Sequence, residues 1–584
     1  MKQLAENRTP LFLLLFLLFI NSFYVDLNNP YKKPITGDAK GYYAYLPAIF
    51  IYQDLDYNFV ADIEAKYYVP ANAKSFVQEI DGEKVNKTFP GVALLYLPFF
   101  LVAHALSLLF GLQADGYSYI YQLLYLIGFW TYFFLGMIYF KKVLLEFNFT
   151  KKIADLSLAI CVLGTNIVFY TLYDSSVTHI YNFFLVNFLI YILLQLKKEI
   201  KLKKLVLFFV TLAIIGITRP TNFLVIGLII FFIPNLSFYK SLFKDIFRLK
   251  NVFIIFFVSF TILTIPFILW YLQTGKWIIY SYGEEGFNFA KPETFDFLFS
   301  YTKGWFLYTP ITLLILLPGI ILLFKSDKKK ALISILFYAI SIYIFSSWWC
   351  WYYGAGLSQR VMIDYTLLLG FLLAGILTFL KDKQALKISL LSLSALLIGL
   401  NIAQSYQISI GVLPFGSPTK EQYWDNFLVF TKQAKIYPQK NWKLIEEEKI
   451  SLNPADSNIV KSNAYYANEN WNINVSDTNE YSAVVRIKNT SAEKGSKLIF
   501  SFDAKATSDI ESTRLVVISD SGETFIFFLK EYLTKGEWIR MEFMAEPLIN
   551  LCRHFDVYFW NAGSKESVEI RNLEFRNYYS QDYF

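Results

Sequence analysis

Long apolar runs separated by short polar connections fill the chain up to about residue 406, after which the apolar segments become short and alternate with period two. A helix that crosses a bilayer needs roughly 17 to 25 mostly apolar residues. Runs near that length cover about 10–26, 91–111, 117–140, 153–172, 177–196, 203–218, 220–236, 251–272, 305–324, 331–347, 362–380 and 388–406. The pattern predicts an α-helical polytopic membrane domain over residues 1–406, with eleven or twelve transmembrane helices.

Two places in this pattern are irregular. Pro98 and His104 interrupt the run 91–111, so this segment is expected to lie along the interface, to re-enter the membrane or to span it. The choice decides between eleven and twelve spans. At Thr218-Arg219-Pro220 we expect two short helices joined by a turn, because one helix through this point would be longer than the bilayer is thick.

The Lys and Arg residues predict the orientation of the helices, because cytoplasmic connections are enriched in them. After residue 111 they cluster in alternate connections, whereas the other connections hold only Arg219, Lys276, Lys291, Lys303 and Arg360. That second set of connections is predicted to be extracytoplasmic. The first loop, 27–90, and everything after about 407 fall on the same side.

The last hundred residues have the spacing of a β-sandwich. Short alternating segments are separated by turn signals such as Lys535-Gly536 and Asn561-Ala562-Gly563. We expect strands near 481–488, 497–505, 513–519, 523–529, 537–544, 555–560 and 567–575. This predicts an all-β domain over 479–584, joined to the membrane domain by a connecting segment, 407–478, whose structure the pattern does not assign.

The amino-acid composition narrows the class of protein. The 584 residues are 55% hydrophobic and 19% aromatic, which is too apolar for a soluble protein. The net charge of +7 comes from clusters between apolar runs and indicates topology rather than nucleic-acid binding. The three cysteines are far apart and no His is spaced for a metal, so neither disulfides nor zinc are indicated. The N-terminus lacks a small-residue cleavage site and predicts an uncleaved first span.

Asp38 is the first candidate for chemistry. It follows the first apolar run and is surrounded by Lys40, Gly41, Tyr42 and Tyr43. It is either a solvated loop carboxylate or helix cap, or a functional group at the membrane surface. An Asp after the first membrane helix, followed by paired Tyr residues, resembles the first extracytoplasmic loop of the GT-C glycosyltransferases, a group that includes protein mannosyltransferases and the lipid A aminoarabinose transferase.

Further segments strengthen that resemblance in the same order along the chain. They are Phe89-Pro90-Gly91 leading to His104; Gly164-Thr165-Asn166 leading through Asp174 to His179; Ser300 to Trp305, which includes Lys303; and Trp348-Trp349 through Tyr353 to Gln359-Arg360. The resemblance covers residues 30–365. It implies a GT-C fold and an inverting transfer of a sugar from a polyprenyl-phosphate donor, with Asp38 at the catalytic position.

The residue types suit this chemistry. A donor phosphate needs cations, and an acceptor hydroxyl needs a base. Asp38 is the candidate base, and Arg219, Lys303 and Arg360 are candidate cations or snorkelling interfacial residues. The other candidate substrate-binding residues are Lys40, Tyr42, Tyr43, His104, Asp174, His179, Glu284, Glu285, Tyr353 and Gln359. Asp174 and His179 are also explained as a helix cap and a packed His. No cofactor is certain; a divalent cation is the one candidate.

The C-terminal strands look like a carbohydrate-binding-module-like jelly roll, with Trp538, Tyr558 and Trp560 as candidate aromatic contacts. A structural sandwich that binds no sugar explains them equally well. The expected protein is an enzyme of the bacterial inner membrane with an extracytoplasmic C-terminal domain, and its acceptor is a glycan, a lipid or a protein. The alternatives are a transporter or flippase of a lipid-linked sugar, or a polysaccharide ligase or polymerase.

Overall fold

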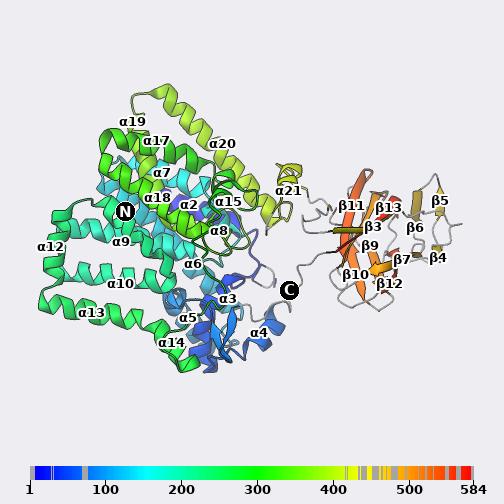
Figure 1. Cartoon of the computed structure of the whole chain (residues 1–584), viewed down its shortest axis with the longest axis horizontal. Helices are drawn as coiled ribbons and strands as arrows, with labels where there is room; N and C mark the ends of the chain where they lie inside the picture. Colours follow the sequence, from blue (N-terminus) through cyan, green and yellow to red (C-terminus); the bar gives the residue numbers. More distant parts are fainter. Residues whose placement is uncertain are drawn as a thin grey trace. The chain divides into compact units, whose positions relative to one another are not determined.

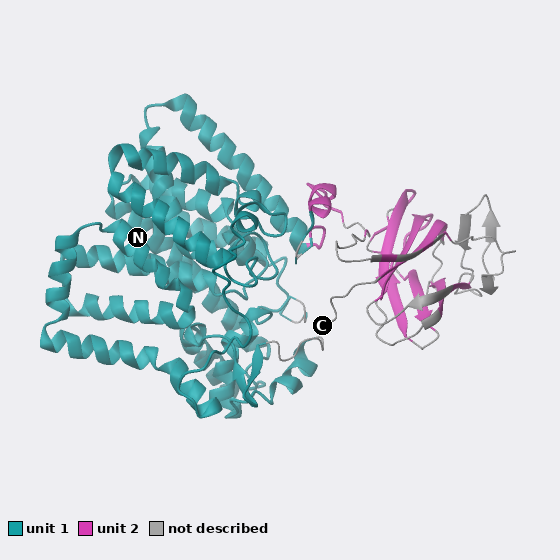
Figure 2. Ribbon diagram, in the orientation of Figure 1, with its two compact units in different colours: residues 1–409, 414–419 teal, residues 410–413, 420–584 magenta. Residues whose placement is uncertain are grey.

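A computed structural model divides the chain into two compact units, residues 1–409 with 414–419 and residues 410–413 with 420–584 (Figure 2). We call them the helical unit and the β unit. The structure describes residues 7–27, 29, 32–68, 76–414, 416, 418–431, 435, 443–449, 459–461, 465–467, 470–474, 484–492, 496–510, 512–519, 523–530, 532–533, 535–545, 552–560 and 567–579.

The helical unit is built from helices and one hairpin (Figure 1). The hairpin pairs β1 (Val77–Ile80) with β2 (Glu83–Asn86). The helices are α2 (Arg8–Asn21), α3 (Asp38–Pro47), η1 (Ala48–Tyr52), α4 (Val60–Tyr67), α5 (Gly91–Leu109), α6 (Tyr119–Glu146), α7 (Lys151–Gly164), α8 (Ile167–Leu172), α9 (His179–Lys198), α10 (Leu202–Thr218), η2 (Pro220–Leu224), α11 (Val225–Phe232), α12 (Leu236–Ile246), α13 (Leu249–Leu263), α14 (Ile265–Thr274), α15 (Thr294–Phe299), α16 (Trp305–Tyr308), α17 (Ile311–Ser326), α18 (Lys328–Ser346), η3 (Arg360–Tyr365), α19 (Thr366–Phe379) and α20 (Gln384–Ser409).

Within the described residues, seven helices are long and apolar enough to cross a membrane, or eight if the bent pair Pro220–Phe232 and Leu236–Ile246 counts as one span. They are Gly91–Leu109, Tyr119–Glu146, His179–Lys198, Leu249–Thr274, Lys328–Ser346, Arg360–Phe379 and Gln384–Ser409. The chain is therefore a multi-pass membrane protein, with fewer long spans than the eleven or twelve expected. The difference arises because α2, α7, α10 and α17 have only 14, 14, 17 and 16 residues.

Two irregular places have clear outcomes. The segment after Pro90 forms an unbroken 19-residue helix, α5, although Pro98 lies inside it. The expected break at Arg219 is confirmed, because α10 ends at Thr218, Arg219 is extended (φ −156°, ψ 117°) and η2 starts at Pro220. A proline in the first turn of a helix replaces no intrahelical N–H bond and has a suitable φ, so a helix can start at Pro220.

Apolar side chains cover the outside of the helical unit. On α13, Phe253, Phe256 and Phe257 are 64%, 62% and 71% exposed. In water such a surface would aggregate, whereas in a bilayer it faces lipid tails.

The segment between α2 and α5 positions Asp38. Gly37 has a φ of +49°, and a Cβ there would meet the Ser176 Oγ at 3.3 Å. Further along α3, a Cβ on Gly41 would meet the Thr88 side chain at 2.8 Å, and the Asn86 Nδ2 donates to the Gly41 carbonyl at 2.9 Å. Glycines therefore allow α3 to lie directly against the hairpin.

The β unit contains the short helix α21 (Lys420–Asp425) and two antiparallel sheets. One sheet has the strand order β10-β9-β12-β7-β4, and the other β11-β8-β13-β6-β5, with β3 paired to β13. The strands are β3 (Lys443–Lys449), β4 (Ile459–Lys461), β5 (Tyr465–Ala467), β6 (Asn470–Asn474), β7 (Val484–Ala492), β8 (Ser496–Ala506), β9 (Arg514–Ser519), β10 (Thr524–Phe528), β11 (Trp538–Ala545), β12 (Cys552–Trp560) and β13 (Ser567–Tyr579).

The two sheets share one apolar core. Phe500 and Phe575 of one sheet and Leu515 and Phe555 of the other are fully buried in it. Each expected strand from 481 onward corresponds to one of β7 to β13. Strands β3 to β6 lie earlier, between 443 and 474, inside the connecting segment 407–478, to which the sequence pattern assigned no structure. The sheets therefore begin well before residue 479.

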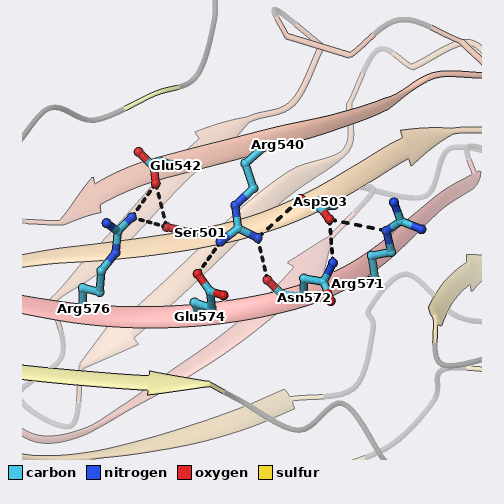
Figure 3. A network of polar contacts seen from close by, with 8 residues as sticks. All are labelled: Ser501, Asp503, Arg540, Glu542, Arg571, Asn572, Glu574 and Arg576. Carbon is cyan, nitrogen blue, oxygen red and sulfur yellow. Dashed lines mark hydrogen bonds and ion pairs between the residues drawn. The ribbon is translucent and has the colours of Figure 1, made fainter. Parts of the chain in front are cut away.

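Charged side chains form a network across β11, β8 and β13 (Figure 3). Arg540 contacts Asp503 and Glu574, and Arg576 contacts Glu542 and Ser501. Arg571 and Asn572 also bond to Asp503. Since each charged group in the network has a partner of opposite sign, the network ties these three strands together rather than leaving a free binding group.

Candidate functional site

A polar cavity of about 200 Å³ gathers segments that are distant in sequence. It lies where α9 and η3 begin and α10 ends, next to the first turn of α3. Its lining residues are Asp38, Tyr42, Lys87, Thr88, Val177, Thr178, His179, Arg219, Tyr282, Glu285, Trp348, Trp349, Cys350, Tyr353, Gly354 and Arg360. Converging helix ends place polar groups at one end of these helices, not halfway along them.

Asp38, the first residue of α3, faces this cavity. Its Oδ2 accepts a hydrogen bond from the Arg360 Nη2 at 2.7 Å. The Asp38 side chain is 42% exposed and the Arg360 side chain 16%. The Asp38 Oδ1 makes no hydrogen bond to a described residue, so one oxygen is oriented by Arg360 and the other is available to a ligand.

Arg219 reaches the cavity from the break between α10 and η2. Its Nη1 lies 2.8 Å from the His179 Nε2, and its guanidinium lies over the Tyr353 ring, 5.6 Å from the centroid. No carboxylate of the described residues pairs with it. Arg219 is therefore a cation whose neighbours in the cavity are a neutral ring and an imidazole.

His179 is itself held by buried polar groups. Its Nδ1 lies 2.8 Å from the Asp364 Oδ1, and the Asn222 Nδ2 donates to the Asp364 Oδ2 at 2.8 Å. A guanidinium has donors only, so the His179 Nε2 must be the acceptor and Nδ1 must carry the proton. The contacts therefore select the neutral imidazole with its proton on Nδ1.

The loop from Lys276 to Lys291 closes one side of the cavity. Its Glu285 pairs with Lys87 at 3.1 Å, and its Ser281 donates to the Lys87 carbonyl at 3.1 Å. On its other side, the Trp349 amide donates to the Gly286 carbonyl at 2.9 Å. The loop is thus tied both to the segment after the hairpin and to the segment before η3.

Burial shifts the pKa of ionisable groups around the cavity. It raises the pKa of the Tyr42, Tyr282 and Tyr353 hydroxyls above the ordinary value. These hydroxyls stay protonated near neutral pH and act as hydrogen-bond donors, not as bases. Burial also raises the pKa of Asp174, and it lowers the pKa of Lys303 to about 7, with the Arg360 charge acting in the same direction.

An apolar groove of about 650 Å³ lies between η2, α11 and α18. Five of its lining side chains, Phe223, Ile226, Ile230, Leu336 and Ile340, are 41% to 61% exposed. A smaller cavity of about 180 Å³ shares Pro220, Thr221 and Phe287 with the groove, and shares Arg219, Tyr282, Trp348 and Tyr353 with the polar cavity. The smaller cavity therefore adjoins both the groove and the polar cavity, which share no lining residue with each other, and Arg219 lines its polar side.

The predicted site residues separate into two sets. Asp38, Tyr42, His179, Arg219, Glu285, Tyr353 and Arg360 line the polar cavity, whereas Lys40, Tyr43, His104, Asp174, Glu284, Lys303 and Gln359 do not.

The second set has other contacts. Lys40 pairs with the buried Glu64 at 2.6 Å. Tyr43 donates to the Gly116 carbonyl at 2.7 Å, and His104 lies 2.6 Å from the Tyr121 hydroxyl. Asp174 caps Ser176. The ammonium of Lys303 donates to the Gly356 carbonyl, and Gln359 is fully buried. These contacts hold the surroundings of the cavity in place.

Sequence reasoning missed Lys87, Thr88, Tyr282, Asn222 and Asp364. Lys87 and Tyr282 carry no local signal, since only the fold brings them to Asp38. Asp364 did carry a local signal in the sequence, because an acidic residue inside an apolar run is costly in a membrane and marks a paired or functional group.

The described residues contain no cluster of three or more His, Cys, Asp or Glu side chains arranged to hold a metal ion. The cavity carboxylates, Asp38 and Glu285, are each paired with a basic side chain. The chemistry proposed below uses no divalent cation.

Neither the protein-family models nor the curated proteins give a match to this chain. Its function is therefore inferred from the geometry of the site.

Proposed function

We propose that this protein is a GT-C-type glycosyltransferase, which moves a sugar from a polyprenyl-phosphate donor to an acceptor on the extracytoplasmic side of a bacterial inner membrane. One observation carries the proposal: a smaller cavity connects a polar cavity, which has a carboxylate and cations, to an apolar groove on the membrane helices. A lipid-linked sugar has the same division, with a charged head and a long apolar tail.

The donor fits the groove and the two cavities in one orientation. The tail lies in the groove between α11 and α18, and the phosphate reaches Arg219 at the polar side of the smaller cavity. The sugar then lies in the polar cavity near Asp38. Guanidinium groups bind phosphate through parallel hydrogen bonds, and Arg219 has donors that its contact with His179 leaves unused.

In the transfer step, the acceptor oxygen forms a bond to the anomeric carbon while the bond from that carbon to the phosphate oxygen breaks. The acceptor proton passes to the Asp38 Oδ1, and the polyprenyl phosphate leaves with the bonding electron pair. Arg360 orients Asp38, and Arg219 stabilises the departing phosphate.

The finer architecture belongs to the same proposal. Eleven or twelve spans require that the shorter apolar helices also cross the membrane, which they can do where the bilayer thins locally. The β unit is then an extracytoplasmic jelly roll, and its outer aromatic residues are candidates for glycan contact.

A transporter is less well supported, because a transport path needs polar groups near the membrane midplane. Here they gather where α9 and η3 begin and α10 ends. A ligase acting on a diphosphate-linked glycan would need more free cations than Arg219, since Lys87 and Arg360 are already paired.

Asp38→Asn tests the proposal. The protein is reconstituted in nanodiscs and supplied with polyprenyl-phosphate hexoses and pentoses, and donor consumption is followed by mass spectrometry with native membrane extract as the acceptor. We expect Asp38→Asn to lower the transfer rate about 10²- to 10⁴-fold while donor binding persists.

Asp81→Asn is the matched control, because Asp81 is an exposed hairpin carboxylate paired with Lys276. It should transfer at the wild-type rate. If the wild type consumes no donor, or Asp38→Asn transfers normally, the proposal fails.

A further inference from the structure

The three cations of the cavity differ in how their charge is compensated. Arg360 pairs with Asp38 at 2.7 Å, and Lys87 pairs with Glu285 at 3.1 Å. Arg219 has no carboxylate partner among the described residues, and its polar contact is the His179 Nε2. A bound anion would have to compete with a carboxylate at the first two cations but not at Arg219.

A cation without compensation is costly away from water. The nearest compensating group in the hydrogen-bonded chain is Asp364, which is 1% exposed and lies on the far side of the His179 ring. The imidazole therefore connects Arg219 to a buried carboxylate while keeping the two charges apart.

We propose that His179, held by Asp364 and Asn222, is a positioning residue for Arg219, keeping its guanidinium oriented and free to bind the donor phosphate. This inference rests on the proposed function, since it concerns the same donor.

The geometry explains why the chain uses a histidine here. An Asp or Glu at position 179 would form a direct ion pair with Arg219 and compete with the phosphate. A neutral imidazole accepts one hydrogen bond and leaves the remaining guanidinium donors available. The imidazole is itself oriented, because its Nδ1 is fixed by the Asp364 Oδ1, and its Nε2 therefore holds Arg219 in a defined direction.

The contacts also tie three elements together at this point. His179 is the first residue of α9, Asn222 lies in η2 just after Arg219, and Asp364 lies in η3. In addition, the backbone amide of Asn222 donates to the Arg219 carbonyl at 2.9 Å. Both the backbone and the side chain of Arg219 are thereby fixed by the same group of residues.

The experiment measures binding of farnesyl phosphate to the full-length protein in nanodiscs, read from the change in tryptophan fluorescence, since Trp348 and Trp349 line the cavity. Farnesol, which lacks the phosphate, serves as the ligand control. We expect His179→Leu to weaken farnesyl phosphate binding about tenfold or more, because the oriented, charged hydrogen bond is lost. His179→Gln keeps a neutral acceptor and should restore most of the affinity.

A double-mutant cycle separates positioning from a general structural role. In an Arg219→Ala background, His179→Leu should cause no further loss of affinity, since the group it positions is gone. Equal losses in both backgrounds would mean that His179 acts only on the structure. Arg248→Ala is the matched arginine control, because Arg248 is exposed and pairs with Asp245.

The outcomes distinguish the two proposals. If wild-type protein does not bind farnesyl phosphate in preference to farnesol, the proposed donor class fails and this inference with it. If Arg219→Ala weakens binding but His179→Leu does not, only the positioning role is overturned. Should His179→Leu not fold, Asn222→Ala releases Asp364 without altering His179, and it should weaken binding only when Arg219 is present.

Discussion

At the scale of single residues, the site depends on side chains that hold one another across long stretches of chain. Asp38 and Arg360 are 322 positions apart and form an ion pair. Lys303, 53 positions from Gly356, donates to its carbonyl in the segment that leads to Arg360. A buried lysine so close to the site gives a pH dependence with a defined sign.

Because burial lowers the pKa of Lys303 from 10.5 to about 7, the unfolded chain binds more protons than the folded chain between pH 7 and 10.5. The contribution of Lys303 to the free energy of unfolding therefore rises with pH through this window, by at most about 1.4 kcal/mol per pH unit. We expect the thermal midpoint of the wild type to rise from pH 7 to pH 9 relative to that of Lys303→Met. Parallel midpoints in the two proteins would contradict the prediction.

The sequence singles out several polar side chains near the ends of apolar runs as candidates for the site. Asp38, Arg219 and Arg360 stand out in the sequence, and all three line the cavity. Two other candidates, Lys303 and His104, do not line the cavity and contact the Gly356 carbonyl and the Tyr121 hydroxyl instead. Lys87 and Tyr282 were unpredictable, since a loop contact between distant segments leaves no periodic signal.

At the scale of elements, the apolar groove between α11 and α18 is the feature with the clearest consequence. Leu336 lines it and is 61% exposed, so a larger side chain there fills the groove without disturbing the core. Leu332 lies one turn earlier on α18, is 60% exposed and does not line the groove.

Leu336→Trp should raise the KM for long-chain polyprenyl donors about tenfold and leave the KM for a short-chain donor nearly unchanged. Leu332→Trp is the matched control and should affect neither. The measurement is donor-dependent kinetics with chains of different length. Equal effects on both chain lengths would show that the tail does not lie in this groove.

The helix break at Arg219 was predictable from the sequence, whereas the strand partners were not. The Arg219-Pro220 step carries its own chemical reason, a missing amide donor and a fixed φ. By contrast, β3 to β6 carry little alternating pattern, and they join the sheets because β3 and β6 pair with β13, β4 pairs with β7 and β5 pairs with β6. Such tertiary pairing overrides local pattern.

At the scale of the whole molecule, the β unit contains an apolar core and two sheets that are formed entirely from its own strands, so we expect it to fold alone. A fragment covering 440–584 should show a β-type circular dichroism spectrum and one cooperative thermal transition. The shorter fragment 480–584 lacks β3 to β6 and exposes the strand edges that they cover, so it should be less stable and aggregate more readily. A helical or unfolded longer fragment would contradict this assignment.

The groove on α11 and α18 has side chains exposed on the outer surface of the membrane helices, while Asp38 faces a polar cavity at their ends. If the groove holds the donor tail, the donor reaches the site by two-dimensional diffusion and a water-soluble acceptor by three-dimensional diffusion. The donor travels within the plane of the bilayer and slides sideways into the groove, whereas a water-soluble acceptor comes from the aqueous volume. The donor quantity that governs the rate is then its density per unit area of membrane, so dilution with other lipids slows the reaction even when the total amount of donor is constant.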